Sequence, residues 1–325
     1  MINVKTMWDL VKLRRIINSR DNTLVMIDNF GIRSLVGVGI SLLLNLPLAI
    51  RLRGDVFIEA KERYLLRHNI LGWLQFRRTA LATKLSFWRS QLIVFNSKYL
   101  LDAISPHLKE KYLTVVYNPF TELSKKKAAD NLAFSLPSEG FHILSVTNMN
   151  LTSKVAPLIR AIDEWMSIDL YEKLDIYWVI LGDGSYKDYI SKIVDERGLK
   201  KRILILGSVA DMTRYYHWSN VLVHLTKLDA FPNTTMESMM FKKAVITNSD
   251  SCGTREQIFH NKNGLIISNS QEFIEALKTY ARNPKLRNQH GQAGKQLVLD
   301  KFSINRQRTN MLNTIENFFR TFDKK

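Results

Sequence analysis

The chain has little cysteine, proline or glycine, and each shortage excludes a class of protein. Only Cys252 among the 325 residues carries a thiol. An intrachain disulfide and a cysteine-based zinc site are therefore excluded, which is typical of a reducing compartment. With 14 Gly and 7 Pro, the composition is neither collagen-like nor of low complexity.

The chain also lacks a long apolar run. The longest uncharged stretch, residues 34–50, has 17 residues and is interrupted by Asn45 and Pro47, whereas a spanning helix needs about 20. We predict a buried helix here, then a turn at residues 45–47 and a strand. Lys5, Asp9 and Lys12 stand where a signal peptide has its apolar segment, so we expect a cytoplasmic protein without a secretion signal.

Acidic residues are few beside the basic ones. Lys and Arg number 47 and Asp and Glu 30, a formal net charge of +17. Residues 1–130 hold 21 basic and 10 acidic residues, whereas residues 131–325 hold 26 and 20. The excess therefore lies mainly in the first part, and it indicates an anionic partner rather than a fold.

The basic residues concentrate in residues 60–91, which hold seven Lys and Arg and a single acid, Glu62. Leucine, phenylalanine and tryptophan alternate with them, a pattern typical of basic amphipathic helices. Such a helix could lie on an anionic membrane, or it could be a solvated helix whose aromatic residues pack inward. Aromatics among cations also suit single-stranded nucleic acid. The chain has no zinc-finger spacing, RNP-like strand or convincing helix-turn-helix, so we expect no nucleic-acid partner.

Short apolar runs alternate with helix-like stretches along the chain. We predict strands at residues 23–28, 47–51, 91–95 and 112–117, and a lysine-rich linker at 125–137. Further strands are predicted at residues 141–145, 176–181, 203–206, 221–225 and 244–247, with helices at 156–167, 185–197, 212–218 and 234–241. Apolar strands of this kind belong to parallel sheets covered on both faces, and repeated βα units give right-handed crossovers in a doubly wound sheet.

The pattern predicts an α/β protein with two Rossmann-like domains that face a cleft. The first would comprise residues 1–130 and the second residues 131–300. Residues 301–325 would form a helix that packs back on the first domain. Ligands are expected beyond the carboxyl ends of the strands.

Gly182 and Gly184 lie between a predicted strand and a predicted helix. Glycine permits a tight turn and a close approach of the backbone there. The geometry of the turn explains these glycines at least as well as a ligand does.

The stretch from Asp229 to Glu237 is a more specific signal. Asn233 or Thr234 could cap the helix that follows, whose free N–H groups and positive dipole end would attract a diphosphate. Glu237, expected in the first turn, could accept two adjacent ribose hydroxyls, and Asp229 could reach hydroxyls of another ring. An ordinary capped helix with a dipole-stabilised Glu fits the spacing equally well.

Several short motifs follow one another in the order of a known family. Asp229 and Glu237, with Phe-Pro-Asn at residues 231–233, match the family's two acids around a G-F-P turn. Residues 252–258 match its G-G-x-x-E-x-I turn, and residues 261–264 its D-G-x-N-G turn. Residues 143–267 therefore resemble the nucleotide-sugar-binding domain of the retaining GT-B glycosyltransferases, specifically glycosyltransferase family 4, the "group 1" transferases.

The resemblance implies a role for each matching residue. Glu237 would bind the ribose, Asp229 the donor sugar and Lys154 a phosphate, while Asn148 stands where the family has an arginine. The backbone of four successive residues would hold the sugar and the diphosphate: Phe231, Pro232, Asn233 and Thr234. Gly182 and Gly207 occupy the expected strand ends, and the backbone from Gly207 to Val209 would meet the base.

The first half matches the family less fully. Residues 51–55, Arg-Leu-Arg-Gly-Asp, occupy the place where many members have a strand followed by a His-Asp or His-Gly pair. Asp55 is expected near the acceptor, and Arg51 or Arg53 could supply the cation that Asn148 does not. A surface turn with solvated arginines is the alternative. This domain is expected to be a reduced one.

The resemblance implies a retaining glycosyltransferase that moves a sugar from a nucleotide-diphosphate-sugar to a glycan or lipid-linked acceptor. It would work at the cytoplasmic face of a membrane, without a metal or a cofactor. All seven histidines are interpreted as structural or solvated. Three alternatives remain open: a soluble small-molecule acceptor, a catalytically silent relative that binds a membrane or partner, and a nucleic-acid-binding protein.

Overall fold

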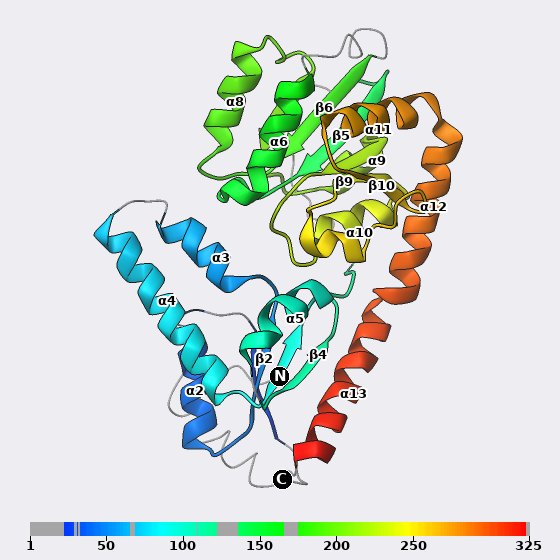
Figure 1. Ribbon diagram of the computed structural model, residues 1–325. Helices are drawn as coiled ribbons and strands as arrows, with labels where there is room; N and C mark the ends of the chain where they lie inside the picture. The colour runs from blue at the N-terminus through cyan, green and yellow to red at the C-terminus, as the bar shows by residue number, and fades with distance from the viewer. Residues whose placement is uncertain are drawn as a thin grey trace. The chain divides into compact units, whose positions relative to one another are not determined.

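The computed structural model describes residues 23–28, 31, 33–65, 69–108, 110–121, 136–165 and 175–322. The chain forms two compact units (Figure 1). Unit 1 comprises Met1–Val116 and Thr309–Lys325, and unit 2 comprises Tyr117–Arg308. The predicted domain boundary at residue 130 and most of the predicted linker fall outside the described residues, as does the N-terminal segment.

Unit 1 is built on a parallel sheet of four described strands, in the order β1 (Val25–Asp28), β2 (Leu48–Leu52), β3 (Leu92–Phe95) and β4 (Tyr112–Val115). Between the strands lie α2 (Ser34–Leu43), α3 (Val56–Ala60), the π-helix η1 (Lys61–Leu65), α4 (Ile70–Arg89), α5 (Lys98–Ile104) and the 3-10 helix η2 (Ser105–His107). The strand order follows the chain order. Right-handed crossovers therefore place the connecting helices on one face of the sheet.

The other face of this sheet is covered by α13 (Ile304–Phe322). Phe318 and Phe319 of α13 are buried in one cluster with Ala49, Leu92 and Val94 of the strands. Since side chains alternate between the faces of a strand, the neighbours of these strand residues point toward the connecting helices. Helices thus cover both faces although the described strands show no reversal of order.

The helix predicted at the start of residues 34–50 forms as α2, and the predicted turn and strand follow it. The expectation that this helix is buried is wrong. Leu42 and Leu43 are 54% and 78% exposed. The buried residues of α2 are Ser34, Val38 and Ser41, and Ser34 Oγ lies 2.8 Å from Ser86 Oγ of α4. Most of the large apolar residues of α2 are therefore exposed, and Val38 is the buried exception.

Unit 2 contains a six-stranded parallel sheet in the order β10-β9-β8-β5-β6-β7. Its strands are β5 (Phe141–Val146), β6 (Ile176–Leu181), β7 (Ile203–Gly207), β8 (Val221–His224), β9 (Ala244–Asn248) and β10 (Gly264–Ile267). Its helices are α6 (Thr152–Trp165), α8 (Lys187–Glu196), α9 (Thr213–Trp218), α10 (Asn233–Met240), the 3-10 helix η3 (Cys252–Glu256), α11 (Ser270–Arg282) and α12 (Pro284–Lys301). The five predicted strands are confirmed to within one residue, and β10 is an addition.

The chain reverses its direction of travel across this sheet between β5 and β8. It proceeds from β5 to β6 and β7, then returns to β8 on the other side of β5. Two apolar clusters cover the two faces: Ile143 and Val221 belong to one, Leu144 and Leu222 to the other. This is a doubly wound sheet, and its reversal opens a crevice at the carboxyl ends of β5 and β8.

Candidate functional site

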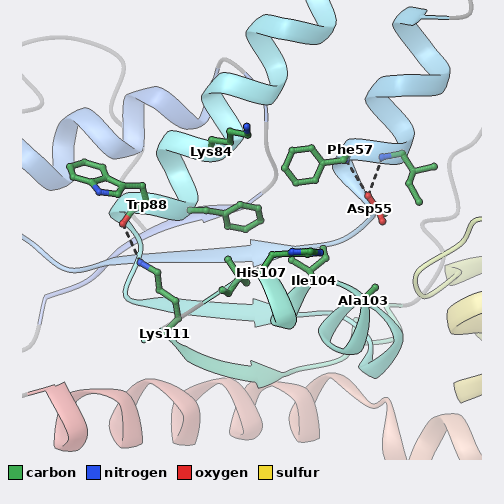
Figure 2. A pocket seen from close by; sticks show the side chains of 11 residues that line it. Asp55, Phe57, Lys84, Trp88, Ala103, Ile104, His107 and Lys111 are labelled. Atoms are coloured by element: carbon green, nitrogen blue, oxygen red, sulfur yellow. Dashed lines mark hydrogen bonds between the residues drawn. The ribbon is translucent and has the colours of Figure 1, made fainter.

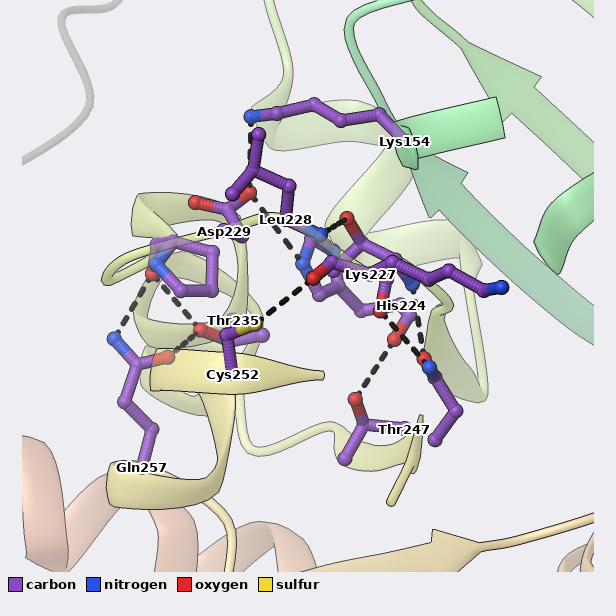
Figure 3. A network of polar contacts seen from close by, with 12 residues as sticks. Lys154, His224, Lys227, Leu228, Asp229, Thr235, Thr247, Cys252 and Gln257 are labelled. Atoms are coloured by element: carbon purple, nitrogen blue, oxygen red, sulfur yellow. Dashed lines mark hydrogen bonds and ion pairs between the residues drawn. The ribbon is translucent and has the colours of Figure 1, made fainter. Parts of the chain in front are cut away.

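The strongest candidates meet at the reversal point of the unit 2 sheet. Lys154 lies in the first turn of α6, which follows β5, and Asp229 lies in the loop after β8. Lys154 Nζ is 3.3 Å from Asp229 Oδ2, and both side chains are about one fifth exposed. Figure 3 shows this contact beside the start of α10. The topology therefore brings together two residues that are 75 positions apart.

His224, the last residue of β8, approaches the same carboxylate. Its Nε2 is 3.7 Å from Asp229 Oδ2, and the residue is 6% exposed. Burial lowers the pKa of His224 to about 4, while Asp229 acts to raise it and Lys154 to lower it. The imidazole is neutral at neutral pH, so Asp229 lies between one cation and one neutral ring. His224 therefore belongs to the candidate site, although the sequence analysis interpreted all seven histidines as structural or solvated.

The turn before α10 is held by two side chains. Thr235 Oγ1 and Gln257 Nε2 both donate to the carbonyl oxygen of Pro232, at 2.9 and 3.0 Å (Figure 3). The amide of Gly253 donates to Asp229 O at 3.0 Å, and a Cβ at Gly253 would lie 1.6 Å from Ala230 O. Only glycine fits at position 253. This gives a physical reason for the glycine in the turn at residues 252–258, which matches the G-G-x-x-E-x-I motif.

The start of α10 differs from the prediction in two ways. The helix begins at Asn233 with Pro232 as its N-cap residue, and no side chain at that position caps it. Asn233 and Thr234 are therefore helical residues and not caps, and Glu237 stands in the second turn rather than the first. The correction strengthens the case for an anion site, because no N-cap side chain occupies the amides of the first turn.

Two hydroxyl groups of α10 remain available for hydrogen bonding. Within the described part of the chain, Thr234 Oγ1 and Ser238 Oγ are buried without a hydrogen-bond partner. Most buried polar groups in proteins are paired. Both groups belong to the helix that begins beside Asp229.

Glu237 is oriented by a residue that the sequence analysis did not single out. Tyr216 of α9 donates its hydroxyl to Glu237 Oε2 at 2.7 Å, and its ring stacks on Phe241 with the centroids 5.3 Å apart. Burial raises the pKa of Glu237, and the hydrogen bond from Tyr216 opposes that rise. The second carboxylate oxygen has no role in this bond and could accept from a ligand.

The loops at the ends of β6 and β7 hold the remaining candidates of unit 2. Gly182 has φ +133°, and a Cβ there would lie 1.8 Å from Thr147 O. Close approach of the backbone therefore explains why position 182 holds glycine, in agreement with the prediction that the geometry of the turn requires it. Its amide donates to Gly207 O at 2.9 Å, and Val209 is half-buried just beyond. Asn148 Oδ1 accepts from the amide of Asn150 at 2.9 Å, which stabilises its own loop.

Arg53 and Asp55 belong to unit 1, whereas the other candidates belong to unit 2. Arg53 forms an ion pair with Asp28. Asp55 is the N-cap of α3 and accepts from the amides of Phe57 and Ile58, each at 3.1 Å. Both side chains therefore have structural partners within unit 1.

The comparisons with known proteins agree with this geometry. A family model for the glycosyl transferases group 1 matches residues 129–297, which is just over half of the chain. The chain belongs to this family. The match includes Lys154 in α6, the loop of Asp229 and the whole of α10, and it extends beyond the motifs recognised in the sequence. Among the described residues of this group 1 member, no cluster of three His, Cys, Asp or Glu side chains could hold a metal ion.

Curated relatives share 20–30% identity with parts of the chain. An N-acetylgalactosamine-N,N'-diacetylbacillosaminyl-diphospho-undecaprenol 4-alpha-N-acetylgalactosaminyltransferase of Campylobacter jejuni is 27% identical over 61% of this chain and 53% of its own length. A poly(ribitol-phosphate) alpha-N-acetylglucosaminyltransferase of Staphylococcus aureus is 22% identical over 49% of this chain and 32% of its own. The chain thus spans about half or less of the length of these relatives.

Solved structures share the fold. Anabaena Alr3699/HepE, in complex with UDP and glucose, has a TM-score of 0.69 at 17% identity and covers 95% of this chain and 81% of its own. The sucrose-phosphate synthase of Thermosynechococcus elongatus has a TM-score of 0.72 at 15% identity, over 97% and 79%. The predicted α/β fold of the GT-B class is confirmed.

Proposed function

We propose that the protein is a retaining glycosyltransferase that uses a nucleotide-diphosphate-sugar. The observation that carries the proposal is the meeting of Lys154, Asp229 and the uncapped start of α10 at the reversal point of the unit 2 sheet. Open α/β sheets bind ligands at such a point. A helix N-terminus beside a lysine suits a diphosphate.

Each part of the donor has a matching group. The first-turn amides of α10 and the ammonium of Lys154 take the diphosphate, and Glu237, oriented by Tyr216, accepts the ribose hydroxyls. Asp229 accepts from hydroxyls of the sugar. In the free protein Asp229 is ion-paired with Lys154, so a bound phosphate exchanges one anionic partner of the lysine for another.

The retaining course requires no nucleophile from the protein. The bond between the anomeric carbon and the diphosphate breaks, and the acceptor hydroxyl bonds to that carbon from the same face. The departing phosphate oxygen takes the hydroxyl proton. The protein positions the two substrates and stabilises the charge that develops on the diphosphate, by Lys154 and the α10 amides. These groups carry out that task without a metal.

The acceptor is a glycan or a lipid-linked molecule at an anionic membrane. The support lies in the outer side of α4, here called the α4 face, whose exposed residues are Ile70, Leu71, Trp73, Leu74, Leu81, Leu85 and Trp88 with the cations Arg77, Arg78 and Lys84. The α4 segment contains no Asp or Glu. Apolar and cationic residues on one side of a helix are typical of helices that lie in a membrane interface. No described helix has the length and apolarity to cross a bilayer.

The names of the relatives agree with this choice of substrates. The Campylobacter jejuni relative is named for a diphospho-undecaprenol substrate, and the Anabaena structure contains UDP. Uridine diphosphate sugars are therefore the first donors to test.

The test is a thermal-shift panel of UDP-, GDP- and ADP-sugars, followed by transfer to lipid-linked acceptors. We expect the nucleotide sugars of one base to raise the Tm of the protein. A ligand at 100 times its Kd stabilises the folded state by about 2.7 kcal/mol. Glu237→Ala should abolish that shift. If no nucleotide sugar raises Tm at millimolar concentration, the donor site is refuted. A shift without any transfer would indicate a catalytically silent relative.

A further inference from the structure

A cavity of about 580 Å3 lies within unit 1, between α3, the second half of α4, and α5 with η2. Figure 2 shows that it extends along the strands, from Asp55 at one end to Trp88 and Lys111 at the other. Ligand sites of small molecules have volumes of about 300–1,000 Å3. The cavity is lined by residues of unit 1 alone, so it is not part of the donor site in unit 2.

Most of the lining is apolar. The rings of Phe57 and Phe87 lie 6.3 Å apart, centroid to centroid, and form part of the wall. The other apolar lining residues are Ile58, Trp88, Ala103, Ile104 and Leu108. Such a wall stabilises an apolar chain by removing it from water.

The polar part of the lining is mainly basic. Lys84, His107 and Lys111 line the cavity together with one acid, Asp55. The Asp55 carboxylate already accepts two amides of α3. Lys111 Nζ donates to the carbonyl oxygens of Trp88 and Ser90, so its charge is held in place by neutral groups. Lys84 and His107 are exposed and free to meet an anion at the mouth.

The cavity also adjoins the α4 face. Trp88 is 70% exposed and lines the cavity, and Leu81 and Leu85, 60% and 41% exposed, precede it on the same side of the helix. Apolar side chains therefore continue from the α4 face to the lining of the cavity, with Lys84 among them. Because the lining is both basic and apolar, the cavity suits a ligand with an anionic group and an apolar chain better than it suits a free anion.

We propose that this cavity binds the phosphate-proximal part of a lipid phosphate, with its apolar chain between Phe57, Phe87 and Ile104 and its phosphate beside Lys84 and His107. The proposal rests on the proposed function, because it names the class of lipid-linked acceptor that the enzyme uses. The size is suitable: at about 30 Å3 for each non-hydrogen atom, as in liquid water, the cavity holds roughly 20 such atoms. A phosphate with an isoprenoid chain of about fifteen carbons has that number.

The probe is farnesyl phosphate, titrated calorimetrically into the full chain below the concentration at which the probe aggregates. We expect farnesyl phosphate to bind at micromolar concentration. Farnesol and inorganic phosphate should bind at least tenfold more weakly, because farnesol lacks the phosphate and inorganic phosphate lacks the apolar chain. Inorganic phosphate binding as tightly as the lipid phosphate would identify an anion site only and overturn the proposal.

Two variants test the location. Lys84→Ala should weaken the binding of farnesyl phosphate about tenfold, whereas the matched control Lys61→Ala, an exposed lysine of η1 outside the cavity, should leave it unchanged. Ala103→Trp should abolish binding by filling the cavity, and because Ala103 is exposed the variant should melt as the wild type does. Undiminished binding in both Lys84→Ala and Ala103→Trp would place the lipid elsewhere and overturn the proposal.

The thermal shift by nucleotide sugars, measured on the same samples, separates the two proposals. A retained shift with no farnesyl phosphate binding refutes the cavity and leaves the donor site standing. Lipid binding that disappears in Ala103→Trp, in a protein that no nucleotide sugar stabilises, supports the cavity and refutes the transferase.

Discussion

The two units hold their charged groups in opposite ways. In unit 2, Lys154, Asp229 and Glu237 are partly buried, and each has a directed partner at 2.7–3.7 Å. In unit 1, Arg77 and Arg78 of the α4 face are exposed among apolar side chains. The first arrangement fixes the position of each group before a ligand arrives. The second leaves its cations exposed to solvent and without an acidic partner on α4, with Arg77 over the ring of Trp73.

The difference has consequences that can be measured. Groups that are fixed around one ligand act on it together, so the loss of one group should remove most of the rate acceleration that they provide. Exposed cations near an anionic surface contribute about 1 kcal/mol each, and salt screens them. Substitutions in unit 2 should therefore have large individual effects, and those in unit 1 should have small, additive, salt-dependent ones.

Lys154→Ala is expected to give the largest effect. Removing one preorganised group that stabilises charge in a transition state costs about 100- to 1,000-fold in rate, so kcat should fall by that factor. The substitution leaves the Asp229 carboxylate, only 20% exposed, without its cation, so Tm should fall but the variant should remain folded. The measurement is steady-state transfer together with a thermal melt.

The matched control is Lys227→Ala, an exposed lysine of the loop that carries Asp229. It should retain the wild-type kcat. Equal losses in both variants would mean that total charge matters and not position, and the contrast between the units would disappear.

The second prediction concerns the pH dependence of stability and the buried His224. Its pKa is about 4 in the folded protein, against the ordinary value of 6.5. Between these values the unfolded chain binds more protons than the folded one, so stability falls as pH falls from 6.5 to 4. The loss should reach about 3 kcal/mol, at 1.36 kcal/mol for each pH unit.

Urea unfolding at pH 7 and pH 4.5 measures this difference. His224→Gln should flatten the pH dependence, whereas His217→Gln, at an exposed position of α9, should retain it. An unchanged slope in His224→Gln would show that the ring titrates normally and that the site is less enclosed than the geometry indicates.

The sequence predicted the strands of unit 2 well because each is a short apolar run between polar segments. Residues 176–181 were predicted without error, since every residue of β6 except Tyr177 is buried and the strand ends at a glycine turn. The failure at α2 has the opposite cause. Apolar residues indicate that a helix has an apolar side, but not that another element covers it, and Leu42 and Leu43 remain exposed.

The site residues also divide into those that a short motif identifies and those that only the fold brings together. Lys154, Asp229 and Glu237 stand in short motifs, so sequence order alone pointed to them. His224 and Tyr216 became visible only when the end of β8 was placed beside the start of α6, and α9 beside α10. The one local signal was a histidine at the end of an apolar strand. The start of α10 was misjudged because Asn and Thr are also common caps, and Pro232 holds that place.

The third prediction tests whether the α4 face acts additively. Arg77→Ala and Arg78→Ala should each weaken binding to vesicles with anionic lipids by about 1 kcal/mol, and the double variant by about 2 kcal/mol, roughly 30-fold. The control Arg282→Ala/Lys285→Ala removes two exposed charges from unit 2 and should not change the partition. Co-sedimentation at low and high salt measures both, and a loss that high salt does not reduce would contradict a screened, adaptable surface.

The smallest effect on catalysis is expected for Tyr216→Phe, which removes one hydroxyl and leaves the ring stacked on Phe241. A hydrogen bond to a carboxylate contributes about 1.5 kcal/mol, so KM for the donor should rise roughly tenfold while kcat changes little, because Tyr216 orients Glu237 and does not meet the reacting atoms. The loss of the bond should also raise the pKa of Glu237, since that bond now opposes the effect of burial. The acidic limb of the kcat/KM profile should then move to higher pH. Tyr189→Phe, at a position of α8 that is 55% exposed, should change neither quantity. An unchanged KM together with an unshifted acidic limb would mean that the tyrosine acts through packing alone, and that the fixed geometry of unit 2 does not depend on this hydrogen bond.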